Sequence, residues 1–353
     1  MAYTAQLTLK GRIGGGQFGD VFEGACPVHG QVAVKVLKQN SGESPADWAL
    51  RSKQLMHEAQ KLKTAAHPNV VQVLQVLEDS TNNVVHLVAE FCNGGTVQDA
   101  YEKGPLTLPQ VRKVITETCR GLEHIHSCGM IHRDIKPSNI MRHDHVCKIG
   151  DFGLVTDDLL LGYASADGYI CHLAPEVFGD STTYGITSAK TDVWALGMTV
   201  YRLLHGDGFY QQLLASKSPL DIRQMITNGG FSQWLDWLPH VPDAWRKFVR
   251  KALHDDTSQR FQTAHAMSQA LAKLPIAPSW NCHFAPNKVT WSRKEGNRTV
   301  TVEWIIHSPR KHEWHAKRSG GGKRDVSVGG TPGKILLSRE ARAELEAFFA
   351  NAS

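Results

Sequence analysis

Two short segments restrict the fold of this 353-residue chain more than any other feature. Residues 132–139 read HRDIKPSN, and residues 151–153, which begin nineteen positions later, read DFG. Together they contain a carboxylate that can act as a base, a lysine cation, and the oxygen-bearing side chains of Asn139 and Asp151, which suit a hard metal ion. Transfer of a phosphoryl group needs this combination, because positioning and charge neutralisation supply most of the catalysis. The two segments therefore predict a phosphoryl-transfer site.

A glycine-rich segment lies near the N-terminus. Residues 14–21 read GGGQFGDV, which fits the phosphate-binding pattern G-x-G-x-x-G-x-V with Gly14, Gly16 and Gly19 at the glycine positions. Alone this pattern is weak, because glycine-rich hairpins are often plain turns. The phosphate interpretation gains weight from the VAVK sequence that follows at residues 32–35.

The VAVK segment alternates like a β-strand, which directs the side chains of Ala33 and Lys35 to one face. An ammonium group on that face is expected near the α- and β-phosphates of a nucleotide. A helical pattern follows over residues 47–64, and Glu58 is its best candidate to orient Lys35 through an ion pair. The alternative is that the charges of this helix form ordinary surface ion pairs.

These segments, taken in order, resemble the catalytic domain of eukaryotic-type protein kinases. The similarity continues with APE at residues 174–176, DVWALG at residues 192–197 and Arg260, and it covers about residues 7 to 274. The resemblance implies a bilobal α+β fold with a small β-rich N-lobe and a larger helical C-lobe. It also implies ATP as phosphoryl donor, Mg²⁺ as metal with Mn²⁺ as an alternative, and a protein as substrate.

The resemblance assigns roles to the residues of the two segments. Asp134 is expected to accept the proton of the substrate hydroxyl, while Asn139 and Asp151 hold two Mg²⁺ ions. Lys136 is expected to touch the γ-phosphate. A lysine two positions after the catalytic aspartate is typical of serine/threonine kinases, so the resemblance favours serine and threonine as acceptors.

The same resemblance places the adenine pocket. Residues 85–89 read as a strand that continues into residues 90–95, and Ala89 falls at the gatekeeper position, where a small side chain predicts a deep back pocket. The pocket residues are expected to be Phe18, Val21, Ala33, Ala89, Met141 and the backbone of Glu90 and Cys92. The family's hydrophobic column between the lobes is matched by Leu62, Val73, His132 and Phe152.

The activation segment combines typical and unusual features. Glu176 and Arg260 are expected to form a buried ion pair that anchors it, and Asp192 is expected to brace the catalytic loop. Arg133 goes with loop phosphorylation in this family, because an arginine there can pair with a phosphate. Candidate acceptors are Thr156, Tyr163 and Ser165, with Ser165 favoured. Tyr169 replaces the usual threonine, which is a departure at the substrate groove.

The motifs and a change of composition divide the chain into four parts. We predict an N-lobe at residues 1–92, a C-lobe at 93–275, a linker at 276–282 and a small basic domain at 283–353. Residues 282–353 carry 13 Lys and Arg against 7 Asp and Glu, so this tail contains the whole basic excess of a chain whose net charge is +5.

The tail sequence matches no family that we can name. Residues 288–292 and 299–307 alternate around a turn and predict a β-hairpin, residues 311–317 are a third alternating run, and a helix is expected from Ser338 to Ala350. The glycines at 320–322 and 329–330 predict a flexible stretch. The basic residues expected to meet phosphates in a nucleic-acid-binding module are Arg310, Lys311, Lys317, Arg318, Lys323 and Arg324. A docking element and a merely solvated basic face are the alternatives.

Composition favours a cytoplasmic enzyme. The seven cysteines are scattered and show neither a disulfide framework nor zinc spacing. No apolar run approaches the length of about 18 residues expected for a membrane span, so no membrane partner is predicted. The leading function is an active serine/threonine protein kinase that phosphorylates itself as well as its substrate. A pseudokinase scaffold and a small-molecule kinase are the alternatives, and the sequence leaves the oligomeric state open.

Overall fold

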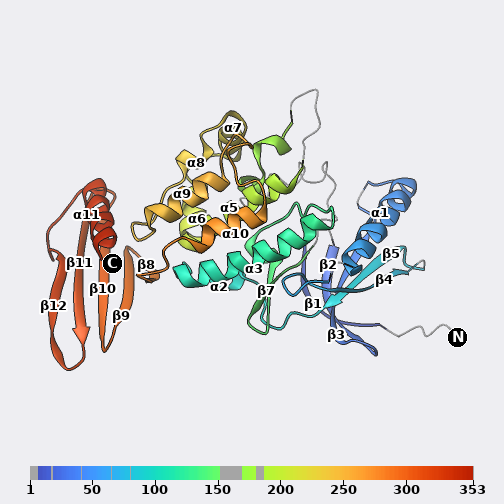
Figure 1. Cartoon of the computed structure of the whole chain (residues 1–353), viewed down its shortest axis with the longest axis horizontal. Helices are drawn as coiled ribbons and strands as arrows, with labels where there is room; N and C mark the ends of the chain where they lie inside the picture. The colour runs from blue at the N-terminus through green and yellow to red at the C-terminus, as the bar shows by residue number, and fades with distance from the viewer. Residues whose placement is uncertain are drawn as a thin grey trace. The chain divides into compact units, whose positions relative to one another are not determined.

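The computed structural model describes most of the chain, with gaps at both termini, in the glycine-rich turn and in the activation segment. The described residues are 7–16, 19–40, 42–64, 66–79, 81–151, 169–179 and 187–352. They fall into two compact units, one formed by residues 7–97 with 117–151 and the other by residues 98–116 with 169–352 (Figure 1).

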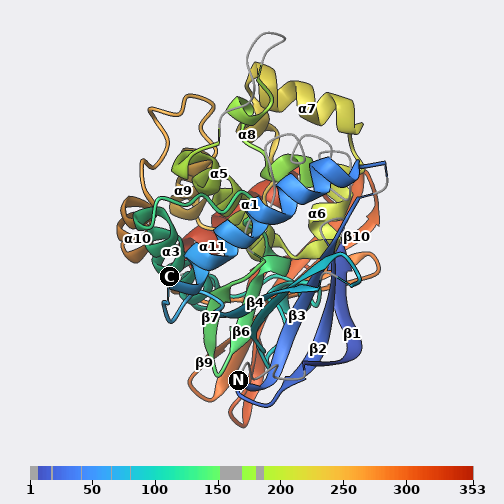
Figure 2. The same cartoon turned by 90° about the vertical axis from the view of Figure 1, so that its right-hand side faces the viewer.

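The first unit contains a five-stranded antiparallel sheet in the order β1-β2-β3-β5-β4. Its strands are β1 (Thr8–Gly16), β2 (Gly19–Cys26), β3 (Gly30–Lys38), β4 (Val73–Asp79) and β5 (Val84–Glu90). Figure 2 shows the neighbouring strands β1, β2 and β3 side by side. Helix α1 (Pro45–Thr64) confirms the helical pattern over residues 47–64 and packs against β4.

Strand alternation explains the burial within this sheet. Val32 and Val34 on β3 and Val88 on β5 point to one face, where they form a core cluster with Cys26. The intervening residues of β3, Ala33 and Lys35, therefore share the other face. The alternation of the VAVK segment thus separates a packing face from a face that is available for chemistry.

The catalytic segment is attached to this sheet by backbone hydrogen bonds. The segment contains a short 3-10 turn, η1 (Pro137–Asn139), and a hairpin of β6 (Ile140–His143) and β7 (Val146–Ile149). The N–H of Val71 donates to Ile149 O at 2.8 Å, and the N–H of Val97 donates to Ile140 O at 2.8 Å. The main chain before β4 and after β5 thus fixes the position of the β6–β7 hairpin, which follows the loop that carries Asp134.

The second unit is largely helical before the tail. Its helices are α2 (Gln98–Tyr101), the first half of α3 (Leu108–Ser127), α5 (Ala189–His205), α6 (Asp207–Leu214), α7 (Pro219–Asn228), α8 (Phe231–Trp234), α9 (Asp243–Ala252) and α10 (Ala264–Ala272), with 3-10 turns η2 (Tyr169–His172) and η3 (Pro175–Val177). Helix α5 is buried from Thr191 to His205, and Ser188 caps its N-terminus through a capping box. A β-rich lobe and a helical lobe confirm the expected fold class.

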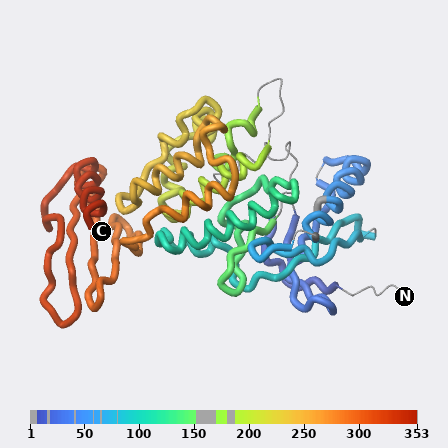
Figure 3. The backbone as a smooth tube through the Cα atoms, in the orientation of Figure 1, coloured from blue at the N-terminus to red at the C-terminus, as the bar shows by residue number. Residues whose placement is uncertain are grey.

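The tail forms a five-stranded antiparallel meander covered by one helix. Its elements are β8 (Asn281–Ala285), β9 (Lys288–Glu295), β10 (Arg298–Ser308), β11 (Lys311–Gly320), β12 (Lys323–Gly330) and α11 (Ser338–Asn351). The strands follow one another in sequence order, which can be traced along the tube in Figure 3. The alternating apolar residues form the buried face as predicted, with Trp291 and Val302 fully buried.

The prediction of a flexible glycine stretch is wrong. Gly320 ends β11, Gly321 and Gly322 form the turn to β12, and Gly329 and Gly330 end strand β12, which pairs with β11. Gly330 adopts φ +67°, and a Cβ atom on it would lie 2.4 Å from the carbonyl oxygen of Trp314. These glycines therefore permit a left-handed backbone and close contact rather than flexibility.

Helix α11 also contacts the helical part of its unit. Arg246 of α9 forms an ion pair with Glu346 at 2.9 Å, and Arg342 binds Asp236 through its two terminal guanidinium nitrogens. Between these ion pairs, the ring of His240 lies against Trp291 and Phe349, with ring centroids 5.8 and 6.1 Å apart. The tail is thus packed onto residues 236–246 through an apolar centre with charged flanks.

Candidate active site

The catalytic loop holds a strained backbone at its centre. Arg133 adopts φ +68°, a left-handed conformation that costs a non-glycine residue of order 1–3 kcal/mol. Ile135 is fully buried on one side of Asp134 and His132 is buried on the other, so the loop is held from both sides. This geometry presents Asp134 between two buried anchors.

Asp134 is the point on which the other polar groups converge. The amide nitrogen of Asn139 donates to Asp134 Oδ2 at 2.7 Å and to the Asp134 carbonyl at 2.8 Å, and Lys136 Nζ lies 2.9 Å from the same Oδ2. The other carboxylate oxygen, Oδ1, is buried and has no hydrogen-bond partner among the described residues. A buried carboxylate oxygen without a donor is costly unless a ligand supplies one. The arrangement therefore leaves one oxygen of Asp134 to accept a proton.

His132 links the catalytic loop to the second motif. The backbone N–H of Asp134 donates to His132 Nδ1 at 3.2 Å, so the ring proton lies on Nε2, which donates to the carbonyl of Gly150 at 3.1 Å. His132 is buried, as its expected place in the hydrophobic column requires. The ring thereby connects the backbone of Asp134 to the carbonyl of Gly150, the residue before Asp151.

Lys35 and Asp151 form an ion pair, which places the strand lysine beside the DFG aspartate. Burial raises the pKa of Asp151, but the Lys35 ammonium, with Lys136, outweighs burial and holds this pKa below its ordinary value. Asp151 is therefore ionised at neutral pH, and its side chain is still 33% exposed. Its φ of +53° is a second left-handed strain at the site.

The residues expected to bind Mg²⁺ fit this ion. Mg²⁺ prefers oxygen ligands and commonly takes only one or two protein carboxylates beside water and phosphate oxygens. The amide nitrogen of Asn139 is engaged with Asp134, so its oxygen is the atom left for a metal. Asp151 contributes an ionised carboxylate of which Lys35 binds one oxygen.

The glycine-rich segment forms a tight hairpin between β1 and β2. Gly14 pairs with Val21, and Gly16 pairs with Gly19. The tip of the hairpin, residues 17–18, includes Phe18 and lies outside the described residues. Gly19 adopts φ +130°, and a Cβ atom there would lie 2.5 Å from Val36 O. Only glycine fits at this position, which brings the turn onto β3.

The expected adenine residues share one face of the sheet. On adjacent strands, Ala33 pairs with Ala89, and Lys35 pairs with both Val21 and Leu87. Side chains directly opposite each other lie about 5 Å apart, so two small alanine side chains leave space beside Lys35. Met141 of β6 contacts Gly150, since a Cβ atom at this glycine would lie 3.2 Å from the Met141 side chain.

The main chain after β5 is also fixed. The N–H of Glu90 donates to Gln72 O at 3.0 Å, so a nucleobase could use only its carbonyl. The Glu90 carboxylate binds Lys148 at 2.8 Å. Burial, followed by the Glu90 charge, raises the pKa of Cys92 to about 11, so this thiol stays protonated at neutral pH.

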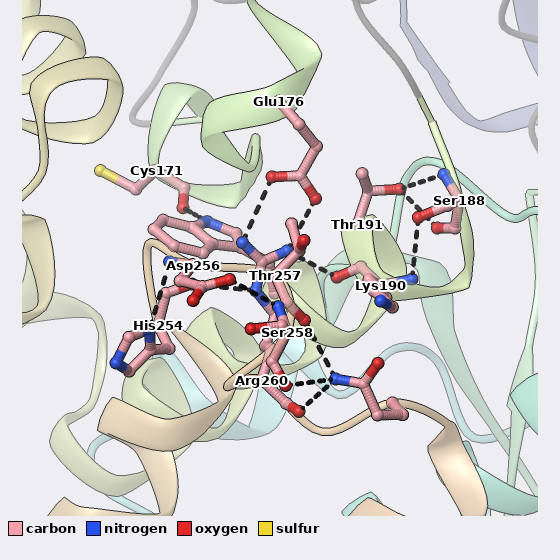
Figure 4. A network of polar contacts seen from close by, with 12 residues as sticks. Cys171, Glu176, Ser188, Lys190, Thr191, His254, Asp256, Thr257, Ser258 and Arg260 are labelled. Carbon is pink, nitrogen blue, oxygen red and sulfur yellow. Dashed lines mark hydrogen bonds and ion pairs between the residues drawn. The ribbon is translucent and has the colours of Figure 1, made fainter.

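The second unit contains the expected anchor of the activation segment. Arg260 binds both carboxylate oxygens of Glu176, at 2.7 and 3.2 Å, and also donates to the carbonyls of Lys190 and His254 (Figure 4). The guanidinium group has no exposed surface and lies 5.1 Å from the ring centroid of Trp194. Asp192 is fully buried at the start of α5.

Several expected residues cannot be placed. The side chain of Glu58 lies outside the described part of the structure, although α1 carries it, and so does the side chain of Tyr169. Phe152 and the three candidate phosphorylation sites, Thr156, Tyr163 and Ser165, also lie outside the described residues.

Sequence reasoning missed one positioning residue, Asn69. Asn69 is buried, and its side-chain amide nitrogen donates to the carbonyl of Cys147 at 2.9 Å. Its backbone carbonyl accepts from the N–H of Ile149 at 2.9 Å. Asn69 therefore holds β7, which leads into Asp151. The signal was available, because an asparagine after His67 and Pro68 and before an apolar run is a turn former at the start of a strand.

The fold and the convergence of Lys35, Asp134, Asn139 and Asp151 are those of enzymes that transfer phosphoryl groups. The model of the protein kinase domain matches residues 7–272. This chain belongs to the protein kinase family.

Curated relatives support this assignment. The human hormonally up-regulated neu tumor-associated kinase is 34% identical over 307 residues, which cover 85% of this chain and 40% of the relative. The serine/threonine-protein kinase TOS3 of Saccharomyces cerevisiae is 34% identical over 225 residues, or 55% of this chain and 39% of the relative. The chain thus spans about two fifths of the length of these relatives. No helix among the described residues is long and apolar enough to cross a membrane.

Proposed function

We propose that this protein kinase uses ATP and Mg²⁺ to phosphorylate serine and threonine hydroxyls of a protein substrate. The observation that carries the proposal is the buried Oδ1 of Asp134, which lacks a donor while Asn139 and Lys136 hold the other oxygen. A substrate hydroxyl is a donor of suitable size for that atom. Lys136 at this position and the serine/threonine kinase TOS3 among the relatives favour aliphatic hydroxyls.

The residues of the site divide the work. Asp134 orients the hydroxyl and receives its proton, and Lys136, 2.9 Å from Asp134, neutralises charge that develops on the transferred group. Lys35 neutralises the phosphates beside Asp151. Asn139 and Asp151 would hold Mg²⁺, which would supply further neutralisation of the phosphate charge. Autophosphorylation in the activation segment is part of the proposal, with Ser165 as the favoured acceptor.

The test is transfer of labelled γ-phosphate from Mg-ATP to a generic protein substrate. Asp134→Asn should reduce the rate by about 10²–10⁴-fold, because it removes the base but keeps the shape. Asp151→Asn should also abolish most of the label. The matched control is Asp144→Asn, since Asp144 lies in the exposed β6–β7 turn.

The products distinguish the alternatives. Label on serine and threonine that depends on Asp134 and Asp151 supports the proposal. If protein whose activation segment carries phosphate binds ATP but transfers no phosphate, the result would indicate a pseudokinase scaffold. Label on a small molecule but never on protein would indicate a small-molecule kinase. Mass spectrometry of the wild type and Asp134→Asn separates autophosphorylation from modification by another enzyme.

A further inference from the structure

One end of the tail sheet is strongly basic. The β9–β10 and β11–β12 turns lie at this end, because Arg298 pairs with Glu295 on one side and with Gly320 on the other. We call this set the basic end. It comprises Arg293, Lys294, Arg298, Lys317, Arg318, Lys323 and Arg324, with only Glu295 and Asp325 as carboxylates. Seven cations against two carboxylates account for most of the excess charge of the tail.

Three arginines of the basic end, Arg293, Arg298 and Arg318, are held in place. The guanidinium group of Arg298 donates to the carbonyls of Arg318 and Arg324, at 2.8 and 2.9 Å, and so bridges β10 to β11 and β12. Glu295 binds Arg293 and, at 2.9 Å, Arg318. One carboxylate is thus shared by two arginines, and the bonds of Arg298 to carbonyls leave its charge in place.

Four further cations project from the same end. Lys294, Lys317, Lys323 and Arg324 are exposed, and none has an ion pair with a carboxylate in the part of the chain that the structure describes. Neighbouring strands are about 4.8 Å apart, so these charges extend over a width of about 15 Å. Such a cluster of exposed cations attracts a polyanion.

The surroundings of the basic end favour a nucleic acid over a protein. Protein interfaces depend on aromatic or aliphatic anchors, whereas the exposed large apolar residue here, among those described, is Val326. The tail tryptophans are buried: Trp280, Trp291, Trp304 and Trp314. No stacking platform for unpaired bases therefore exists among the described residues of this end.

We propose that the basic end of the tail binds the phosphate backbone of a nucleic-acid duplex without reading its bases. Lysine and arginine contacts to phosphates suffice for such binding, and they make it steeply dependent on salt. Two of the residues that the sequence suggested as phosphate contacts, Arg310 and Lys311, do not belong to the basic end. They lie in the β10–β11 turn at the opposite end of the sheet. The inference is independent of the kinase reaction.

The test measures the anisotropy of labelled duplex DNA, duplex RNA and single-stranded DNA of mixed sequence, titrated with the full chain at several salt concentrations. Lys323→Gln/Arg324→Gln should weaken duplex binding about tenfold and reduce the slope of log K against log salt by about 1.8, or about 0.9 for each lost phosphate contact. Lys294→Gln/Lys317→Gln is a second variant on other strands. The two duplex arms decide between DNA and RNA.

The matched control is Arg310→Gln/Lys311→Gln, which removes the same charge from another turn of the same sheet. Its affinity should change no more than about twofold, because salt screens charges beyond about 10 Å. Equal losses in the control and test variants, or no duplex binding at low salt, would overturn the proposal. Equal competition by a polyglutamate peptide would also overturn it and indicate an acidic protein partner. Thermal unfolding of each variant shows that it is folded.

Discussion

At the scale of single residues, the site depends on which oxygen or nitrogen of a side chain is already engaged. Asn139 and Lys136 use one oxygen of Asp134 and leave the other without a donor. The ring of His132 has one tautomer because a backbone N–H occupies Nδ1. The atoms that are already engaged therefore determine which atoms of the motif residues remain available to a substrate.

Ala89 gives the first prediction at this scale. Ala89 and Ala33 are directly paired, so Ala89→Met would fill the space that two small side chains leave beside Lys35. We expect ATP-competitive inhibitors with bulky aromatic groups to lose about tenfold or more in affinity, or ~1.4 kcal/mol, by calorimetry. Ala89→Gly is the control and should retain binding. Equal affinity of the methionine variant for such inhibitors would exclude a back pocket at this position.

The Glu176–Arg260 ion pair gives the second prediction at this scale. Glu176→Gln leaves a fully buried guanidinium group without its charge partner, which should lower the free energy of unfolding by about 3–5 kcal/mol. Urea denaturation followed by tryptophan fluorescence measures this loss. Lys247→Ala, which breaks the exposed pair with Asp243, should cost no more than about 1 kcal/mol. Similar costs for the two variants would show that burial does not control the strength of the pair.

At the scale of elements, α11 has two roles that its sequence alone does not separate. It covers the tail sheet, and it also contacts residues 236–246 through Arg342, Glu346 and Phe349. An amphipathic pattern predicts one buried face but not which neighbours share it. The tail is therefore attached by more than its linker.

Phe349 tests this attachment. Its ring packs against His240, Trp280 and Trp291, so Phe349→Ala should reduce stability by about 3–5 kcal/mol and accelerate proteolytic release of the tail. The control is Phe348→Ala on the same helix, which removes a ring that is only half-buried and should cost less. If both variants resisted protease as the wild type does, α11 would not hold the tail.

At the scale of the whole molecule, buried neutral histidines make stability depend on pH. Burial, with a smaller contribution from the nearby Arg246, lowers the pKa of His205 and of His240 to about 3. The aromatic neighbours of His240 are Trp291 and Phe349. Because both pKa values are depressed in the folded state, the stabilisation is complete above about pH 6.5 and is lost as pH falls.

The resulting prediction concerns mild acid. Between pH 7 and pH 5, each histidine should cost about 2 kcal/mol of stability, at ~1.4 kcal/mol for each pH unit below its unfolded pKa. Thermal unfolding across this range measures the effect. His240→Phe should remove about half of the dependence, whereas His283→Gln on the exposed strand β8 should leave it unchanged. A flat profile for the wild type would contradict the prediction.

The sequence by itself determined the family and the fold class, and it predicted the candidate catalytic residues, because catalysis requires particular side chains at fixed spacing. It also predicted the central hairpin and the helix of the tail from their periodicity. Tertiary structure alone decided which oxygen of Asp134 stays available, how Asn69 holds β7, and which cations gather at one end of the tail sheet. Strand β12 was missed because its pattern contains only two apolar residues, Val326 and Val328, and pairing with β11 rather than its own sequence makes it a strand. Such features arise from contacts between residues distant in the chain, and local patterns carry no record of them.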